Sequence, residues 1–371
     1  MTDRASYRIL IGGGGTGGHV FPAIAIADAL KAQLPGSRFL FVGALGRLEM
    51  EKVPEAGYEI VGLPVAGFQR RLTLKNVGVG IRLIRSLLLS RKIIRRFRPD
   101  VAVGVGGYAS GPILRAASRR GVPVVIQEQN SYAGLTNRLL AAAAKRICVA
   151  YENMDRYFPA AKIELTGNPV RAALLSDERD RTDCLKLFEL DPAKTTCLLI
   201  GGSLGARTLN MSVLAGLELI QEAGLQLIWQ CGKARYKEMQ RALEGRDSRG
   251  ILLTPFIADM SAAYGAADVI VSRAGALSIS ELCIIGKPAV LVPSPNVAED
   301  HQTRNAEALV KKEAAIMVRD ADAEQELVGR LIALLDDEAL MGRMSENMRR
   351  LGIPDAANRI AEEVKKTMKK R

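Results

Sequence analysis

The chain has 371 residues, of which 48% are hydrophobic and 25% charged, and its formal net charge is +12. This is a globular composition that excludes a disordered or collagen-like chain, and the length exceeds the roughly 250–300 residues of a single core, which favours two domains. The five cysteines are scattered and form no CxxC pair, which predicts a reduced protein without disulfides or a zinc site. The sequence has no signal-peptide pattern and no run of about 18 apolar residues, so we expect a cytosolic protein without a membrane span.

Short apolar runs alternate with helical patterns along the chain, which is typical of α/β domains with parallel sheets. In the first half we expect strands at Arg8–Ile11, Arg38–Val42, Val101–Val105, Val122–Gln127 and Arg146–Ala150. A helix is expected from about Pro22 to Leu34, with the proline in a first turn, where it is tolerated.

The same plan starts again after Thr166–Arg171. A strand at Thr196–Ile200 leads into GGSLGA and a helix from about Ala206, and further strands are expected at Gln226–Gln230, Gly250–Thr254, Val269–Ser272 and Ala289–Val292. We therefore expect an α/β fold of two doubly wound, Rossmann-like domains facing a central cleft, residues 1–166 and 167–354. The last helix, at about 355–371, could pack back on the first domain, although the sequence does not decide between the first and the second domain.

Four glycine-rich turns follow expected strands: Gly12–Gly18, Gly104–Gly111, Gly201–Gly205 and Arg273–Gly275. Such turns let backbone N–H groups approach an anion closely, and the following helix N-terminus adds about half a positive charge. Any one of them could simply connect a strand to a helix. Four of them, at the strand ends where α/β proteins bind ligands, favour phosphate binding.

The spacing Gly12-x-Gly14-x-x-Gly17 formally matches a dinucleotide-binding motif, but the second strand ends in Phe41-Val42-Gly43, without the acid that would hold a ribose. An NAD-dependent oxidoreductase is therefore disfavoured. The sequence also contains no GxxxxGK[ST] loop, which excludes a P-loop ATPase. A nucleotide-sugar transferase explains more of the pattern.

In such an enzyme Ser203 and the amides of Gly202–Gly205 could bind the diphosphate, with Arg171 as a cation. Glu281 could accept a pair of ribose hydroxyls, or it could only oppose a helix dipole. His19 could act as a general base near pH 7, or it could be a cap or a phosphate contact. His301 could touch the donor sugar or cap a helix.

No metal site is expected. Metal-dependent sugar transferases hold Mg²⁺ or Mn²⁺ with closely placed acids, and no such pair lies on a glycine turn here. The nearest candidates, Glu299 and Asp300, read as a solvated acidic pair in a loop.

Several segments resemble, in order, the MurG family of peptidoglycan glycosyltransferases. They are GGGGTGGHVFPAIAIADAL, GVGGYASGP, EQNSYAGLTNRLLA, LTGNPVR, GGSLGARTLN, SRAGALSISEL, GKPAVLVPSP and DHQTRNA, and with the terminal IPDAANRIAEEV they cover nearly the whole chain. The resemblance implies a GT-B fold and an inverting transfer of N-acetylglucosamine from UDP-N-acetylglucosamine to the C4 hydroxyl of lipid-linked muramyl-pentapeptide (lipid I), giving lipid II. The nucleotide sugar would be a substrate, and no cofactor is implied.

Site residues follow from the same resemblance. Donor contacts would be Thr16, Gly17, Gly18, Asn130, Arg171, Ser203, Ile257 at the uracil, Ala276, Leu277, Ser278, Ile279, Ser280, Glu281 and, on the sugar, Gln302. The acceptor diphosphate would contact Gly14, Gly15, Gly106, Gly107, Tyr108 and Ser110, and His19 would be the catalytic residue. Where the family commonly has histidine before Glu128, this chain has Gln127, which can hydrogen-bond but not titrate.

Between Glu59 and Asp100 the chain has no acid and ten basic residues. A helix from Ile81 to Arg98 would carry Leu83, Leu87, Ile94 and Phe97 on one stripe, which could pack on its own domain or, with the bases, face an anionic membrane. We expect a peripheral protein on the cytoplasmic face of the cell membrane, with cell-wall synthesis proteins as possible partners.

Other functions remain open at this point. Within the same fold, the acceptor could be another lipid such as diacylglycerol, or the chain could be a UDP-sugar epimerase. A basic nucleic-acid-binding protein would fit the charge, but only 5% of residues are aromatic, which leaves few platforms for stacking bases. We therefore expect no nucleic-acid partner.

Overall fold

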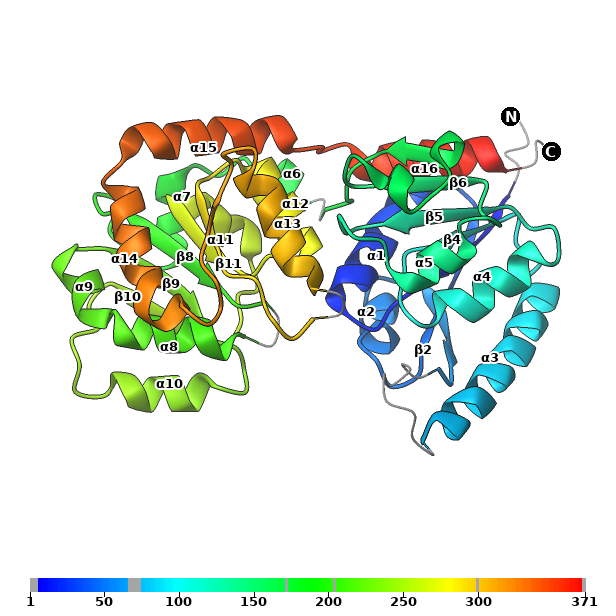
Figure 1. The fold of residues 1–371 in the computed structure, drawn as a ribbon, viewed down its shortest axis with the longest axis horizontal. Coiled ribbons are helices and arrows are strands. Elements are labelled where there is room, and N and C mark those ends of the chain that lie inside the picture. The colour runs from blue at the N-terminus through cyan, green and yellow to red at the C-terminus, as the bar shows by residue number, and fades with distance from the viewer. Residues whose placement is uncertain (1–5, 66–74, 171–172, 203–204, 298–299, 369–371) are drawn as a thin grey trace. The chain divides into compact units, whose positions relative to one another are not determined.

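A computed structural model describes residues 6–65, 75–170, 173–202, 205–297 and 300–368. The chain divides into two units (Figure 1). The first unit comprises Met1–Arg171 with Ile353–Arg371, and the second comprises Ala172–Gly352. The division therefore falls five residues after the boundary expected at residue 166.

The first unit is built on a seven-stranded parallel sheet of order β3-β2-β1-β4-β5-β6-β7. Its strands are β1 (Arg8–Gly12), β2 (Arg38–Ala44), β3 (Glu59–Leu63), β4 (Val101–Gly104), β5 (Val124–Glu128), β6 (Arg146–Val149) and β7 (Ile163–Leu165). Its helices are α1 (Gly17–Gln33), α2 (Glu49–Glu55), α3 (Lys75–Phe97), α4 (Ser110–Ser118), α5 (Leu135–Leu140) and α16 (Ala356–Thr367), with short 3-10 turns at Met154–Arg156 and Ala160–Lys162.

Both faces of this sheet are covered, so successive apolar residues of one strand enter different cores. Leu10 of β1 packs with α3, α4 and α5, while its neighbours Ile9 and Ile11 pack with α1 and α16. The final helix α16 thus returns to the first unit, where it contacts α1 and the strands β4, β5 and β6 (Figure 1). Ile360 and Val364 of α16 are fully buried there.

The second unit repeats the plan with a six-stranded parallel sheet of order β10-β9-β8-β11-β12-β13. Its strands are β8 (Thr196–Ile200), β9 (Gln226–Gln230), β10 (Ile251–Thr254), β11 (Val269–Ser272), β12 (Ala289–Leu291) and β13 (Ile316–Met317). Its helices are α6 (Ala173–Ser176), α7 (Arg181–Leu187), α8 (Arg207–Ala215), α9 (Leu217–Glu222), α10 (Tyr236–Leu243), α11 (Met260–Ala266), α12 (Ala276–Ile285), α13 (His301–Val310), α14 (Ala323–Leu335) and α15 (Glu338–Leu351).

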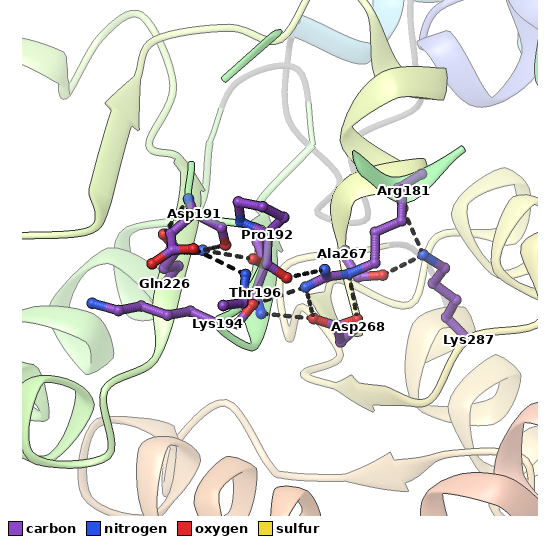
Figure 2. Close-up of polar contacts among 11 residues, drawn as sticks. Arg181, Asp191, Pro192, Lys194, Thr196, Gln226, Ala267, Asp268 and Lys287 are labelled. Atoms are coloured by element: carbon purple, nitrogen blue, oxygen red, sulfur yellow. Dashed lines mark hydrogen bonds and ion pairs between the residues drawn. The ribbon is translucent and has the colours of Figure 1, made fainter. Parts of the chain in front are cut away.

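A polar clasp closes the amino-terminal end of this second sheet (Figure 2). Arg181 of α7 forms a two-point ion pair with Asp268, at 2.8 and 2.7 Å, and also donates to the carbonyls of Pro192 and Lys194. Asp268 in turn accepts from the backbone N–H of Thr196 at 2.8 Å. Beside it, the ammonium of Lys287 donates to the carbonyls of Gly265 and Ala267, and burial lowers its pKa.

The expected doubly wound α/β architecture is confirmed, with strands at every predicted position. The expected start of the first helix is wrong: α1 begins at Gly17, so Pro22 lies inside it rather than in its first turn. The backbone N–H groups of His19 and Val20 already bond to the Thr16 carbonyl, which places the glycines in the first turn. Three edge strands, β3, β7 and β13, were not predicted.

The stripe expected on the basic helix is only partly buried, since Ile94 is 2% exposed and Phe97 packs against the core. The inward face of α3, which packs beside α4 (Figure 1), carries Ser86, Ser90 and Ile93. Leu83, the first residue of the expected stripe, is 39% exposed. None of the helices in the described part of the chain is both long and apolar enough to cross a membrane.

Candidate functional site

In the first unit, the site residues gather where the strand order reverses. β1 lies between β2 and β4, and the last residues of β1 and β4, Gly12 and Gly104, are register partners. The two glycine-rich turns that follow these strands therefore start side by side at the carboxyl edge of the sheet. This is the position at which open α/β sheets bind their ligands.

The first turn carries His19 on the opening turn of α1. The His19 Nδ1 lies 3.2 Å from the Thr16 hydroxyl. The amides of Gly17 and Gly18 begin the helix, so they have no acceptor within it and can donate hydrogen bonds to an anion. The structure gives the Gly15 amide a different acceptor, the carboxylate of Glu49 at 2.8 Å.

The second turn packs directly on the first. A Cβ on Gly107 would overlap the carbonyl of Gly14, and one on Gly106 would lie 2.8 Å from His19 Cδ2 and Nε2. Gly106 and Gly107 also have positive φ angles, +90° and +83° respectively, so this contact requires glycine twice. The fully buried Ser110 ties the turns together, since its hydroxyl lies 2.7 Å from the carbonyls of Gly12 and Gly106.

Tyr108 points outward from this second turn, with 59% of its surface exposed. It is therefore the member of the expected acceptor-diphosphate set that lies most open to a ligand, whereas Ser110 is buried among backbone carbonyls.

A buried polar network supports the segment after β5. The Glu128 carboxylate is 2% exposed and accepts from the backbone N–H and side-chain amide of Asn130, the N–H of Gly134 and the amide of Asn137. Burial raises the pKa of Glu128, against the opposing effect of these hydrogen bonds. Asn130, which was expected to contact the nucleotide sugar, is thus held by a carboxylate on its own turn.

Gln127 belongs to the same network. It is fully buried, donates to Asn168 Oδ1 at 2.9 Å and accepts from the Gln129 amide, which also bonds to the Val105 carbonyl at 2.7 Å. The residue that replaces the family's usual histidine is therefore a hydrogen-bonded link between β5 and the turn after β4.

The second unit has an equivalent reversal between β8 and β11, where Ile200 and Ser272 are register partners. The turn after β8 approaches the neighbouring strand closely, because a Cβ on Gly205 would overlap the carbonyl of Cys231. Gly205 has a φ of +73°, which glycine tolerates best. Ser203 and Arg171, both expected at the donor diphosphate, lie outside the described residues.

α12 follows the turn after β11 and carries Glu281, which is 4% exposed. The hydroxyl of Tyr264, itself fully buried, donates to Glu281 Oε2 at 3.0 Å. Sequence reasoning missed Tyr264, which lies on α11 and fixes the orientation of the expected ribose acceptor.

The other residues expected at the donor also lie in the second unit. The range Ala276–Ser280 forms the first turns of α12, and the Ser280 hydroxyl donates to the Ala276 carbonyl at 3.0 Å. Ile257 is 5% exposed, and Gln302 on α13 accepts from the backbone N–H of Ser294 at 2.8 Å.

A second missed residue is Arg273, in the turn after β11. Its guanidinium forms an ion pair with Asp320 at 2.5 Å and donates to the carbonyls of Val292 and Pro293. Asp320 also accepts from the Thr208 hydroxyl on α8 at 3.1 Å. This network joins the chain segments that follow β11, β12 and β13, so it organises the carboxyl edge of the sheet.

The expected acidic loop pair is only partly visible, because Glu299 lies outside the described residues. Asp300 accepts from the Thr303 hydroxyl at 2.7 Å, and His301 begins α13. Within the described residues, no three His, Cys, Asp or Glu side chains gather in a group that could hold a metal ion.

Comparisons with known proteins cover both units. The model of the glycosyltransferase family 28 N-terminal domain matches residues 9–149, and that of the C-terminal domain matches residues 196–360. A Bacteroides fragilis protein is 55% identical over 97% of this chain and 95% of its own length. A Parabacteroides distasonis protein is 53% identical over 98% of this chain and 99% of its own.

Both proteins are named UDP-N-acetylglucosamine–N-acetylmuramyl-(pentapeptide) pyrophosphoryl-undecaprenol N-acetylglucosamine transferase. Among solved structures, MurG of Acinetobacter baumannii superposes with a TM-score of 0.79 at 30% identity, covering 97% of this chain and 99% of that one.

Proposed function

The chain belongs to glycosyltransferase family 28 and has a GT-B fold, and from that premise we propose that it transfers N-acetylglucosamine from UDP-N-acetylglucosamine to lipid I, giving lipid II. The acceptor atom is the C4 hydroxyl of the muramyl sugar, and the transfer inverts the anomeric centre. The observation that carries this proposal is identity above one half, over nearly the full chain, to relatives named for that reaction.

The arrangement in the first unit supports His19 as the base in this reaction. When Nδ1 donates to the Thr16 hydroxyl, 3.2 Å away, Nε2 keeps its lone pair and can accept the proton of the acceptor hydroxyl. The Gly106 backbone lies beside Nε2 and leaves no room there for a side chain. As the sugar leaves UDP, negative charge develops on the diphosphate, which the free amides at the helix N-termini stabilise.

The test is transfer of radiolabelled N-acetylglucosamine from its UDP conjugate to a lipid I analogue. We expect a lipid II product in the wild type, and no product when diacylglycerol replaces the analogue. Glycosylation of diacylglycerol alone would replace this proposal with another lipid acceptor, and formation of UDP-N-acetylmannosamine would indicate an epimerase.

His19→Ala should lower kcat by about 10²–10⁴-fold, the usual contribution of general acid–base catalysis. UDP affinity, measured by calorimetry, should stay within about twofold of the wild type, since a folded variant keeps its nucleotide site. Near-normal turnover in a variant that still binds UDP would remove His19 from the role of base.

We further propose that α3 brings the enzyme to the cytoplasmic face of an anionic membrane. Ile84 and Leu88 are 61% and 57% exposed on this helix, and Arg82, Arg85 and Arg96 are exposed around them. Apolar side chains between bases are typical of helices that lie in a membrane interface, where each base contributes about 1 kcal/mol.

Co-sedimentation with vesicles tests this surface. Binding should require anionic lipid, weaken with salt, and fall at least tenfold when Arg82, Arg85 and Arg96 are all replaced by glutamine. A matched control removes three exposed arginines of the second unit, Arg319, Arg330 and Arg350, and should bind as the wild type does. Equal losses in both triple variants would reduce the effect to overall charge.

A further inference from the structure

Glu49 is a buried carboxylate beside the first glycine turn. It is the first residue of α2 and only 1% exposed. Its Oε2 accepts from the Gly15 N–H at 2.8 Å, and its Oε1 accepts from the Ala44 N–H, also at 2.8 Å. One carboxylate therefore joins the turn after β1 to the end of β2.

The surrounding glycines are shaped around this side chain. A Cβ on Gly14 would overlap the Glu49 carboxylate, and a Cβ on Gly43 would overlap its Cγ. Gly14 and Gly15 have φ angles of +136° and +100°. Glycine can adopt many other backbone conformations, so this one needs contacts that stabilise it. Among the described residues, no Lys or Arg forms an ion pair with Glu49, so its charge is satisfied by backbone donors.

The hydrogen bond between Glu49 and Gly15 lies next in the chain to the residues that hold His19, the proposed base. Gly15 precedes Thr16, whose carbonyl starts α1 and whose hydroxyl contacts His19 Nδ1. The Gly14 carbonyl also lies against Gly107 of the second turn. Moving Gly15 therefore moves the imidazole relative to the Gly106 backbone beside it.

We infer that Glu49 is a positioning residue, which fixes the first glycine turn and so sets the place of His19 for the transfer reaction. The inference rests on the proposed function of His19. It also implies that the Gly15 amide does not bind the acceptor diphosphate, because an internal anion already occupies it. Charge-assisted bonds from two amides to one carboxylate suit this role, since they fix both direction and distance.

Glu49→Gln tests the inference, because glutamine keeps the size of the side chain but has one accepting oxygen and presents an NH₂ to the other amide. The matched control is Glu51→Gln, an exposed carboxylate on the same helix. With transfer measured well below the unfolding temperature, Glu49→Gln should lower kcat by about 10–100-fold, the scale of a small misplacement of a reacting group. UDP affinity should change by less than about twofold, and the control should match the wild type throughout.

Two readouts do not depend on turnover. Amide exchange in the peptide that covers residues 12–18 should be at least tenfold faster in Glu49→Gln than in the control. The chain has two histidines, so a spectrum of ¹³C-labelled histidine gives two imidazole signals, which His301→Gln assigns. The His19 signal should shift or broaden in Glu49→Gln while that of His301 stays in place.

Normal kcat in Glu49→Gln would overturn the inference, as would unchanged exchange and an unmoved His19 signal. If wild-type protein transfers no sugar, the proposed function fails by itself. The exchange and histidine spectra then still decide whether Glu49 holds the turn.

Discussion

Buried glutamates shape the candidate site of each unit. Glu49 and Glu128 accept from backbone and amide donors in the first unit, and Glu281 accepts from Tyr264 in the second. A buried carboxylate without donors would be strongly destabilising, so each of these side chains is fixed by its partners. Side chains held in this way can present an oxygen or a turn to a ligand with little loss of conformational entropy.

Glu281→Ala should weaken UDP binding by about tenfold or more, because a hydrogen bond to a charged acceptor is worth roughly 1.5–3 kcal/mol and every 1.4 kcal/mol is tenfold. It should also reduce the preference for UDP over 2′-deoxy-UDP. Tyr264→Phe removes the 3.0 Å bond that orients the carboxylate and should produce a smaller change in the same direction. Calorimetry with both nucleotides gives the comparison. An unchanged preference in Glu281→Ala would leave the carboxylate with a helix-dipole role only.

At the scale of the element, the two ends of the second sheet have different tasks. The carboxyl ends of β8 and β11 carry the glycine turns, whereas the amino ends are closed by Arg181, Asp268 and Lys287 (Figure 2). The clasp ties α7 and the segment before β8 to the start of β11, far along the chain. We therefore expect it to contribute mainly to stability.

Asp268→Ala should destabilise the protein by about 1–3 kcal/mol, since its partly exposed carboxylate is both the partner of Arg181 and the acceptor of the Thr196 N–H. Asp247→Ala, which breaks the more exposed pair with Arg249, should leave the stability nearly unchanged. Urea denaturation measures both values. If UDP affinity falls together with stability in Asp268→Ala, the clasp also shapes the nucleotide site.

The sequence predicts some elements to the residue and misses others for physical reasons. β8, β9 and β11 coincide with their predicted bounds because central parallel strands are buried on both faces and read as continuous apolar runs. β3 and β13 lie at sheet edges, where the pattern is short and half-exposed, and they escape prediction. On α3 the expected stripe holds at Ile94 but not at Leu83, because Ser86 and Ser90 occupy the inward face there.

The same distinction applies to the site. The glycine turns are local in sequence, so their place after strands predicts their role. Glu49 and Tyr264 escape prediction because they act on partners 34 and 17 residues away, at Gly15 and Glu281, and no periodicity links such pairs. Contacts between turns appear only once the sheet has set its strands in register.

At the scale of the whole molecule, the chain passes out of the first unit and returns to it. Ile360→Ala on α16 should therefore lower the stability of the first unit by about 2–5 kcal/mol, because the side chain is fully buried against α1 and the sheet. Hydrogen exchange should increase across β4, β5 and β6 and stay unchanged in the second unit. Arg359→Ala, on the exposed side of the same helix, serves as the control. Uniform loss of protection in both units would mean that they unfold as one.

The return of α16 to the first unit has a consequence for folding during synthesis on the ribosome. Residues 172–352 emerge as one continuous stretch and contain everything that the second unit needs. The first unit lacks residues 353–371 until all of the second unit has been translated, so the face that receives Ile360 and Val364 stays uncovered until then. Vectorial synthesis usually completes the amino-terminal domain first, and here that order is inverted. The nascent chain therefore exposes an apolar surface for as long as the second unit is being made.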